Sequence, residues 1–210
     1  MPKTNLQNYA FTFTAGGLLL DEILSLLDYL IENRVNELND AIKKNDILKT
    51  NAMASRVRIV TEIRRRYKAV DSWVWTFLKN SNLDEQKLIL FFVMLKATPI
   101  FFDFQSEVIL EKWRSRDLHL DKNDVLYFFD KKTQVYPDIE TRTEATRTKA
   151  ATVIVRILRE SGILVKNTIN QPQAADYFWN YFIKHDEAWF LELALLPQHQ
   201  RKELMDNYED

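Results

Sequence analysis

Only three glycines, Gly16, Gly17 and Gly162, and five prolines interrupt this chain of 210 residues. A protein made of many short strands needs frequent turns, and glycine and proline supply most of them. Their scarcity favours long helices, so we expect an all-α, compact multi-helix bundle. Hydrophobic residues make up 46% of the chain, which is enough to bury a sizeable core.

The chain is long enough for one domain or for two closely packed lobes. Residues 131–141 form a polar stretch that includes Pro137 and is the best candidate for a boundary. We therefore expect an N-terminal helical lobe at 1–135 and a C-terminal helical lobe at 136–210, with a single domain over 1–210 as the alternative.

Periodicity and capping residues predict where the helices lie. Residues 9–14 alternate apolar and polar side chains and predict a short extended piece, followed by a helix from about 16 to 39. Further helices are expected at about 40–49, 55–80 with a break near Asp71, 84–94, 104–114 and 123–129. Pro172 suits the first turn of an aromatic helix, and Pro197 precedes what reads as a polar, acidic tail.

Residues 143–161 carry the clearest helical pattern. The apolar side chains gather on one side, at Ala150, Val153, Ile154, Ile157 and Leu158. The opposite side is polar and basic, at Lys149, Thr152, Arg156 and Arg159. Gly162 stands where a left-handed residue would end the helix, and 163–165 with 166–169 predict a short strand pair that resembles the wing of a winged helix.

Arg147 breaks that pattern, because it projects toward the apolar side near the start of the helix. A guanidinium in that position must find a carboxylate, a carbonyl or a phosphate. A phosphate contact would make Arg147 part of a binding surface. An ion pair to a buried acid such as Asp103 or Glu107 is the structural alternative.

Basic charge is concentrated in two segments of a chain whose net charge is −1. Residues 56–68 have a local balance of +5 and residues 142–166 a balance of +4, so the rest of the chain is acidic. In the first segment the basic residues flank or oppose an apolar stripe, at Arg58, Arg64, Arg65 and Lys68. They predict either phosphate binding or a solvated charged face with intrahelical pairs such as Glu62 with Arg58 or Arg66.

Signatures of catalysis and of metal binding are scarce. The chain has no cysteine, its three histidines are far apart in sequence, and no nucleophile elbow or phosphate-binding glycine loop is present. We therefore predict that the protein is not an enzyme, and we expect no cofactor and no metal. The longest apolar run, Leu88 to Leu95, is far shorter than the roughly 20 residues of a membrane span. With no visible signal peptide, we expect a cytoplasmic protein without a membrane partner.

Four motifs, in this order, resemble the BrxA family, the small accessory proteins of bacterial BREX (bacteriophage exclusion) defence systems. They are Phe11-Thr-Phe-Thr-Ala-Gly-Gly-Leu-Leu-Leu, Phe104-x-x-Glu-Val-Ile-x-Glu-Lys-Trp, Asp124-x-x-x-Phe-Phe-Asp, and Thr146-Arg-Thr-Lys leading to Arg156-Ile-Leu-Arg-Glu-Ser-Gly-Ile-Leu. The resemblance runs from about residue 9 to 165. Its C-terminal motif is matched at Arg147, Lys149 and Gly162, and its N-terminal motif at Gly16 and Gly17. The aromatic segment after Pro172 matches no motif of the family.

The resemblance implies a helical fold similar to the NusB antitermination factor. It also implies binding to nucleic acid, above all double-stranded DNA, and action beside the methyltransferase and ATPase components of the defence system. We expect phosphate contacts from the basic residues of both segments, Arg58, Arg64, Arg65, Lys68, Arg147, Lys149, Arg156 and Arg159. The alternatives are a protein–protein adaptor whose basic surfaces dock on acidic partners, and an RNA-binding protein.

Overall fold

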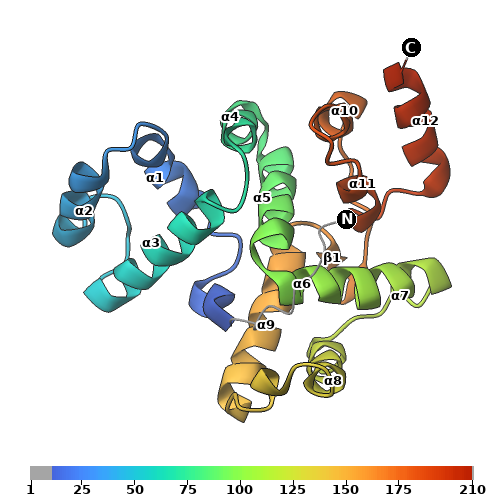
Figure 1. Ribbon diagram of the computed structural model, residues 1–210, viewed down its shortest axis with the longest axis horizontal. Coiled ribbons are helices and arrows are strands. Elements are labelled where there is room, and N and C mark those ends of the chain that lie inside the picture. Colours follow the sequence, from blue (N-terminus) through green and yellow to red (C-terminus); the bar gives the residue numbers. More distant parts are fainter. Residues whose placement is uncertain (1–10, 210) are drawn as a thin grey trace.

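The computed structural model describes residues 11–209, which are mostly helical (Figure 1). The α-helices are α1 (Leu20–Ile31), α2 (Val35–Lys44), α3 (Met53–Tyr67), α4 (Ser72–Asn80), α5 (Leu83–Ala97), α6 (Pro99–Phe104), α7 (Leu110–Ser115), α8 (Lys122–Thr133), α9 (Glu144–Glu160), α10 (Asp176–Lys184), α11 (Trp189–Leu193) and α12 (Gln198–Glu209). The described part also contains the 3-10 helices η1 (Phe11–Ala15) and η3 (Pro137–Ile139), the π-helical segment η2 (Gln105–Ile109), and the hairpin of β1 (Leu164–Val165) and β2 (Thr168–Ile169). The predicted all-α bundle with a short β element is confirmed.

Helix α5 lies at the centre of the molecule and packs against α1, α3, α4, α6 and α9. Asn82 accepts hydrogen bonds from the backbone N–H groups of Asp84 and Glu85, and Glu85 accepts one from the N–H of Asn82 in return. This reciprocal cap satisfies backbone donors that would otherwise lack partners at the helix start. Every side chain from Leu88 to Leu95 is buried, as expected for so apolar a run.

The chain turns sharply after α5, because Pro99 cannot continue the helix and instead begins α6. The segment Pro99–Ser115 bends away from α5 by 110°. Within residues 11–209 no single helix is long and apolar enough to cross a membrane, and only this bent pair passes the test of length and composition. The side-chain amide of Gln105 donates to the carbonyl of Leu193 at 2.6 Å, which ties the π-helical segment to the C-terminal helices.

The N-terminal part differs from its prediction. Residues 11–15 form a 3-10 helix with Phe11 and Phe13 buried, whereas an extended piece was expected; Tyr9 and Ala10 lie outside the described residues. The helix expected from 16 to 39 is divided into α1 and α2. Asn33 stops α1 because it takes a left-handed conformation with φ 53°, which asparagine tolerates better than most residues.

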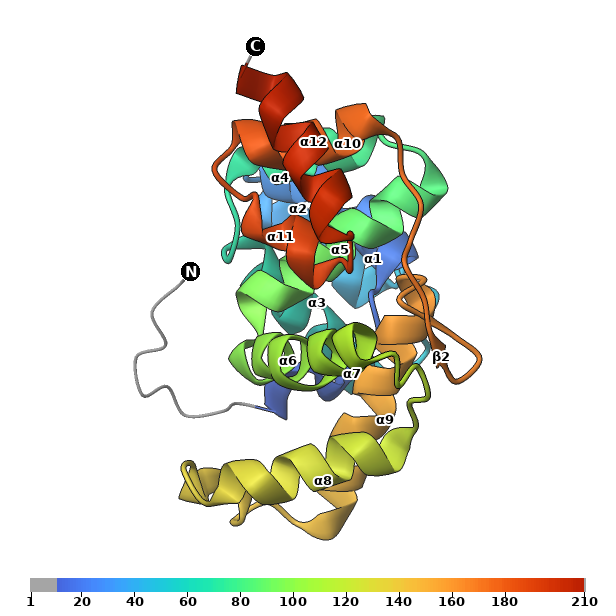
Figure 2. The same cartoon turned by 90° about the vertical axis from the view of Figure 1, so that its right-hand side faces the viewer.

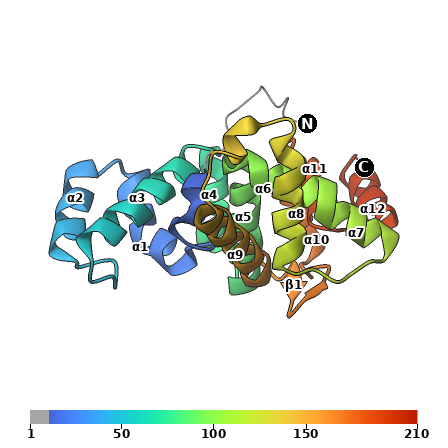
Figure 3. The same ribbon diagram turned by 90° about the horizontal axis from the view of Figure 1, so that it is seen from below.

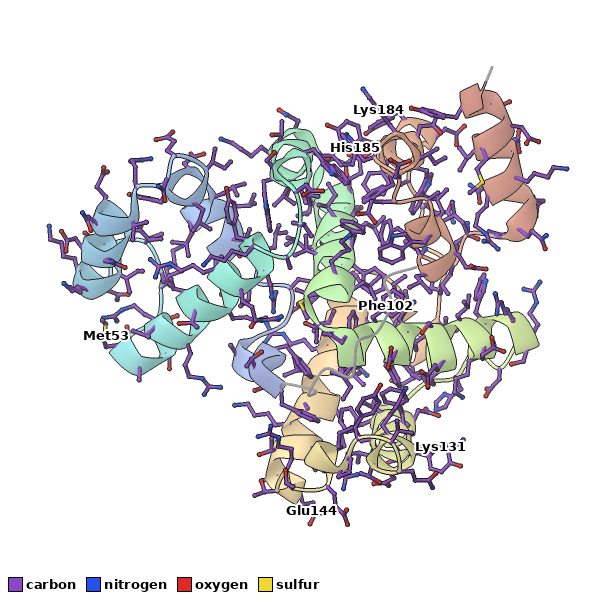
Figure 4. All side chains as sticks on the ribbon, viewed as in Figure 1. Met53, Phe102, Lys131, Glu144, Lys184 and His185 are labelled. Carbon is purple, nitrogen blue, oxygen red and sulfur yellow. The ribbon has the colours of Figure 1, made fainter. Side chains whose placement is uncertain are left out.

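The C-terminal helices bury much of their aromatic surface, although Tyr177 of α10 is exposed. Phe178, Trp179 and Phe182 are fully buried. His185, labelled in Figure 4, stacks on Trp73 of α4 with ring centroids 4.2 Å apart. The expectation for Pro172 is wrong, because this residue precedes the start of α10 by four residues. The polar, acidic stretch expected after Pro197 forms the helix α12.

Helix α8 packs directly against α9 and lies beside it in Figure 2. The boundary expected between residues 135 and 136 therefore falls in the connection between two packed helices. The division into two lobes stays a prediction.

Candidate nucleic-acid interface

Helix α9 displays its basic residues as one exposed stripe. Thr143 caps the helix, since its hydroxyl accepts a hydrogen bond from the N–H of Thr146 at 3.2 Å. All the residues of the predicted apolar side are buried, and Lys149, Thr152, Arg156 and Arg159 are exposed. Their spacing of three and four residues places them on one side of the helix, so the predicted amphipathic helix is confirmed.

The hairpin after α9 is fixed by three features. Gly162 has φ +80° with open space beside its Cα, so it allows the left-handed turn that ends the helix. Strand β1 then pairs antiparallel with β2, with Leu164 opposite Ile169. The guanidinium of Arg159 donates to the carbonyl of Lys166 at 3.1 Å and to Oδ1 of Asn167 at 2.9 Å, which fastens the turn of the hairpin to α9.

A third extended segment completes a small sheet. Residues 118–120 run beside β2, where the N–H of Ile169 donates to Leu118 and the N–H of Leu120 donates to Asn167. An isolated antiparallel bridge joins His119 to Thr168. The order along the chain is therefore α7, extended segment, α8, α9, β1 and β2. That is the order of elements in a winged helix, with α9 in the position of the recognition helix and the hairpin in that of the wing.

Helix α3 uses much of its basic charge inside the protein. Arg56 is buried and donates to the carbonyls of Ile42, Thr50 and Asn51 at 2.7 to 2.9 Å. Arg66 is 1% exposed and donates to the carbonyl of Leu18 at 2.8 Å. The local balance of +5 in the sequence thus overstates the charge that α3 offers to solvent.

A buried carboxylate on α3 binds two arginines of the same helix. Glu62 accepts from Arg65 at 2.9 and 2.7 Å and from Arg66 at 2.8 Å. Burial by itself would raise the pKa of Glu62, but these hydrogen bonds and charges outweigh burial and lower its pKa below the ordinary value. Arg65 also donates to the carbonyl of Ala97 and to the hydroxyl of Thr98 at the bend after α5. Of the pairs expected for Glu62, the one with Arg66 is confirmed.

Three predicted basic residues remain on the surface of α3. Arg58 and Lys68 are exposed, and their side chains have no ion pair or hydrogen bond with any described residue. Arg64 is partly buried and donates to Oδ1 of Asn39 on α2 at 3.0 Å, a contact that leaves its charge uncompensated.

Arg147 forms an ion pair with Asp130 on α8. The expected partners, Asp103 and Glu107, instead accept from Lys132 at 3.0 and 2.6 Å. Burial works against the charged form of Lys132, but the two carboxylates outweigh it and raise the pKa of Lys132 above its ordinary value. The predicted ion pair of Arg147 is therefore confirmed, but its partner is Asp130 and not Asp103 or Glu107.

Glu160 is a residue that sequence reasoning left without a role. Its carboxylate accepts from Nε of Arg156 at 2.6 Å and from the N–H of Leu18 at 2.5 Å. A Cβ on Gly17 would collide with the same carboxylate, so a larger residue there would require the Glu160 side chain to shift. The spacing of four residues between Arg156 and Glu160 could have predicted their ion pair. No pattern in the sequence could show that Glu160 lies beside the Gly16-Gly17 pair.

The start of α1 and the second half of α9 border a shallow pocket of about 410 Å³. Its charges are mixed, because Lys87, Arg156 and Arg159 line it together with the acids Asp21, Glu22 and Glu160. The acids reduce the positive potential at this end of the stripe. The end that carries Lys149 lies outside this pocket, and the Lys149 side chain forms no ion pair or hydrogen bond with a described residue.

The two basic helices are separated by η1, which contacts both of them (Figure 3). Both helices also bind the backbone of Leu18, whose N–H donates to Glu160 of α9 and whose carbonyl accepts from Arg66 of α3. The structure thus gathers Lys149, Arg156 and Arg159 into one stripe, with Lys166 on the adjoining hairpin. Lys166 counted toward the basic balance of this segment but was not predicted as a site residue.

A profile of the family described as BrxA matches residues 7–186. The chain is 27% identical over 124 residues to a protein of Bacillus cereus named "BREX protein BrxA", and 23% identical over 123 residues to one of the same name from Escherichia coli. Each match covers 59% of this chain, and they span 62% and 58% of the two relatives, which is less than two thirds of either.

The fold is similar to that of a crystal structure of an uncharacterized protein from Magnetospirillum magneticum. The TM-score is 0.73 at 16% sequence identity, and the likeness covers 90% of this chain and 98% of that one. At this identity the likeness concerns the fold alone.

Proposed function

The chain belongs to the BrxA family, and on that premise we propose that it is a non-catalytic, DNA-binding accessory protein of a BREX antiphage defence system. Its place would be the cytoplasm, where duplex DNA is present. The observation that carries the DNA proposal is the exposed basic stripe of α9 beside a hairpin in the position of a wing. An α-helix fits the major groove of duplex DNA, and basic residues on its outer side reach the flanking phosphates.

Three residues of α9 would carry most of the binding. Lys149 is exposed and has no partner among the described residues, so its ammonium is available to a phosphate. Arg159 already holds the hairpin turn through neutral acceptors, so it keeps its full charge while it positions Lys166. Arg156 must share its guanidinium between Glu160 and a phosphate. Contacts of this kind give an affinity that depends on salt and discriminates little between sequences.

The remaining predicted residues would have smaller roles. Arg58 and Lys68 can extend the phosphate contacts along α3, because both are exposed and unpaired among the described residues. Arg64, Arg65 and Arg147 are engaged with Asn39, Glu62 and Asp130 respectively, so we assign them mainly to holding α2, α3 and α8 in place.

The two relatives are named BREX proteins, which supports a role beside other components of such a system, including its methyltransferase and ATPase. The rival proposal is a protein–protein adaptor inside the defence complex. It is favoured by the acidic remainder of the chain and by an apolar groove that is described below. RNA binding is a third outcome of the same test.

The proposal is tested by fluorescence-anisotropy titration of labelled duplex DNA, single-stranded DNA and RNA of equal length, at low and near-physiological salt. The test variant carries Lys149→Glu, Arg156→Glu and Arg159→Glu, three exposed positions, and its thermal unfolding is compared with that of the wild type. Duplex binding that weakens with salt and disappears in the variant supports the proposal. Preference for RNA or for single strands moves the function to those ligands, and no binding to any nucleic acid at low salt leaves only the adaptor.

A further inference from the structure

The groove between α2 and α3 differs in chemical character from the polar stripe of α9, because it is apolar at its centre and basic at its rim. We propose that this groove docks an acidic amphipathic helix of a partner protein. This interaction surface is separate from the proposed DNA contacts and does not depend on them.

The groove has a volume of about 210 Å³. Its floor consists of the buried side chains of Ile42 and Val60. Its wall carries Met53 and Val57, which are 42% and 46% exposed although both are apolar. Met53 lies at the end of α3 that points away from α5 (Figure 4). Adjacent exposed apolar side chains over an apolar floor are typical of a surface that another protein covers, and methionine adapts well to different partners.

The charged residues that line the groove are all basic. The lining residues include Lys43 and Arg64 and no acid. Arg64 is held only by the neutral side chain of Asn39. Lys43 has the carboxylate of Asp40 at 3.8 Å, but both side chains of this pair are highly exposed, so the pair is weak. The one acid of α3, Glu62, is buried and paired with arginines, so α3 presents no carboxylate to solvent. A partner complementary to this surface must carry acidic residues.

Two other occupants fit less well. A second copy of the chain would bring the same cationic rim of α3 against itself, because a twofold interface places like against like. Duplex DNA would cover Met53 and Val57 with phosphates that cannot pack against apolar side chains, whereas α9 offers it a wholly polar stripe. A helix with an apolar stripe and acidic flanks satisfies both the floor and the rim.

The geometry also limits the length of the occupant. Met53 and Arg64 are eleven residues apart on α3, which corresponds to about 16 Å along the helix axis. A partner helix of roughly three turns covers that distance. Its apolar anchors would recur at spacings of three and four residues, with Glu or Asp beside them.

The experiment uses the full-length protein and a small set of labelled helical peptides of about 15 residues. All share a leucine stripe with different registers; one half of the set has glutamate flanks and the other half lysine flanks. Binding is followed by fluorescence anisotropy. The groove variant carries Met53→Gln and Val57→Gln, the rim variant carries Lys43→Gln and Arg64→Gln, and Arg58→Gln with Lys68→Gln is the matched control for charge on the same helix.

We expect acidic peptides to bind and lysine peptides not to bind. The groove and rim variants should each weaken binding by at least about tenfold, and the control by less than about twofold. The proposal is overturned if no acidic peptide binds at about 1 mM, or if the groove variant binds them as the wild type does. Displacement of the peptide by unlabelled duplex would assign the groove to DNA. Self-association that is lost in the groove variant would assign it to a second copy.

Failure of this proposal and failure of DNA binding are distinguishable. The variant with Lys149→Glu, Arg156→Glu and Arg159→Glu should still bind the acidic peptides, because its changes lie on α9. The groove variant, in turn, should retain duplex binding. If one variant loses both duplex binding and peptide binding and its unfolding temperature is lowered, the cause is a folding defect. The milder single change Val57→Gln then distinguishes a binding defect from a folding defect.

Discussion

Helices α3 and α9 have similar basic composition, but the protein uses the two sets of charges differently. In α3 the side chains of Arg56, Arg65 and Arg66 turn inward or sideways and bind carbonyls and the buried Glu62. In α9 only Arg147 is used in this way, paired with Asp130, and Lys149, Arg156 and Arg159 stay in one exposed stripe. Basic residues therefore mainly stabilise the fold in one helix and are mainly available to a ligand in the other.

The difference follows from what surrounds each helix. Helix α3 packs against α1, α2, α5 and η1, so several of its sides face backbone carbonyls that need donors. Helix α9 buries a continuous apolar side and leaves the other to solvent. An arginine becomes structural where neighbouring elements offer buried acceptors, and the sequence of its own helix does not reveal those neighbours.

The largest expected effect is on stability and concerns Glu62. Glu62→Ala would leave the buried guanidinium of Arg66 without its carboxylate, which should cost about 3–5 kcal/mol of unfolding free energy. Arg156→Ala removes only the exposed pair with Glu160 and should cost less than about 1 kcal/mol. Urea unfolding of both variants measures the contrast. Equal losses would show that the two helices do not differ in this way.

Acid should remove the same stabilisation gradually. The pKa of Glu62 lies below its ordinary value of 4.5 in the folded protein, because the bonds from Arg65 and the charges of Arg66 and Arg65 outweigh burial. A lowered folded-state pKa contributes stability that is fully present above the unfolded value and is lost as the pH falls through the folded one. The stability gap between the wild type and Glu62→Gln should therefore be constant above pH 4.5 and narrow below it.

Arg58→Gln supplies the reference for that acid titration, since Arg58 has no carboxylate partner among the described residues. Its stability difference from the wild type should show no such narrowing. A gap for Glu62→Gln that stays constant down to the pH of acid unfolding would mean that the Glu62 carboxylate contributes no linked stabilisation.

The next effect concerns binding and compares charge reversal on the two helices. Reversal of Lys149, Arg156 and Arg159 should weaken duplex binding by more than about a hundredfold, because three contacts become repulsive. Reversal of Arg58 and Lys68 should cost about tenfold or less, since these residues lie outside the helix and wing that we assign to the duplex. Titrations at a single low salt concentration suffice. A larger loss for the α3 pair would transfer the DNA surface to α3.

Much of the helical framework was predictable because its signals are local. Asn82 and Asp121 cap α5 and α8 within three residues of Glu85 and Asp124, which complete the caps, and Gly162 ends α9 as its position predicted. The all-α class followed from the scarcity of turn residues. The break between α1 and α2 was missed, because Asn33 lies inside an unbroken apolar period and only its left-handed backbone reveals the stop.

The candidate site was predictable in part. The stripe of α9 follows from helical periodicity, whereas the fate of each arginine in α3 depends on carbonyls distant in sequence, such as Leu18 and Ala97. The same reason hid the pairing of Arg147 with Asp130 and the role of Glu160. The fold similarity to NusB and the direct contacts with DNA stay predictions.

The smallest expected effect separates residues within α9 by the salt dependence of duplex binding. Each DNA phosphate that the protein neutralises contributes about 0.9 to the magnitude of the slope of log affinity against log salt. Lys149→Ala should therefore reduce the slope by close to that amount, because Lys149 is unpaired among the described residues. Arg156→Ala should reduce it by less, since Glu160 already compensates part of its charge.

Glu160→Gln should raise affinity severalfold by freeing Arg156, while the amide oxygen can still accept from the N–H of Leu18. If Glu160→Gln leaves affinity unchanged and Arg156→Ala matches Lys149→Ala, the ion pair does not restrain Arg156. The stripe would then act as uniform charge, and the mixed pocket beside α1 would have no influence on binding.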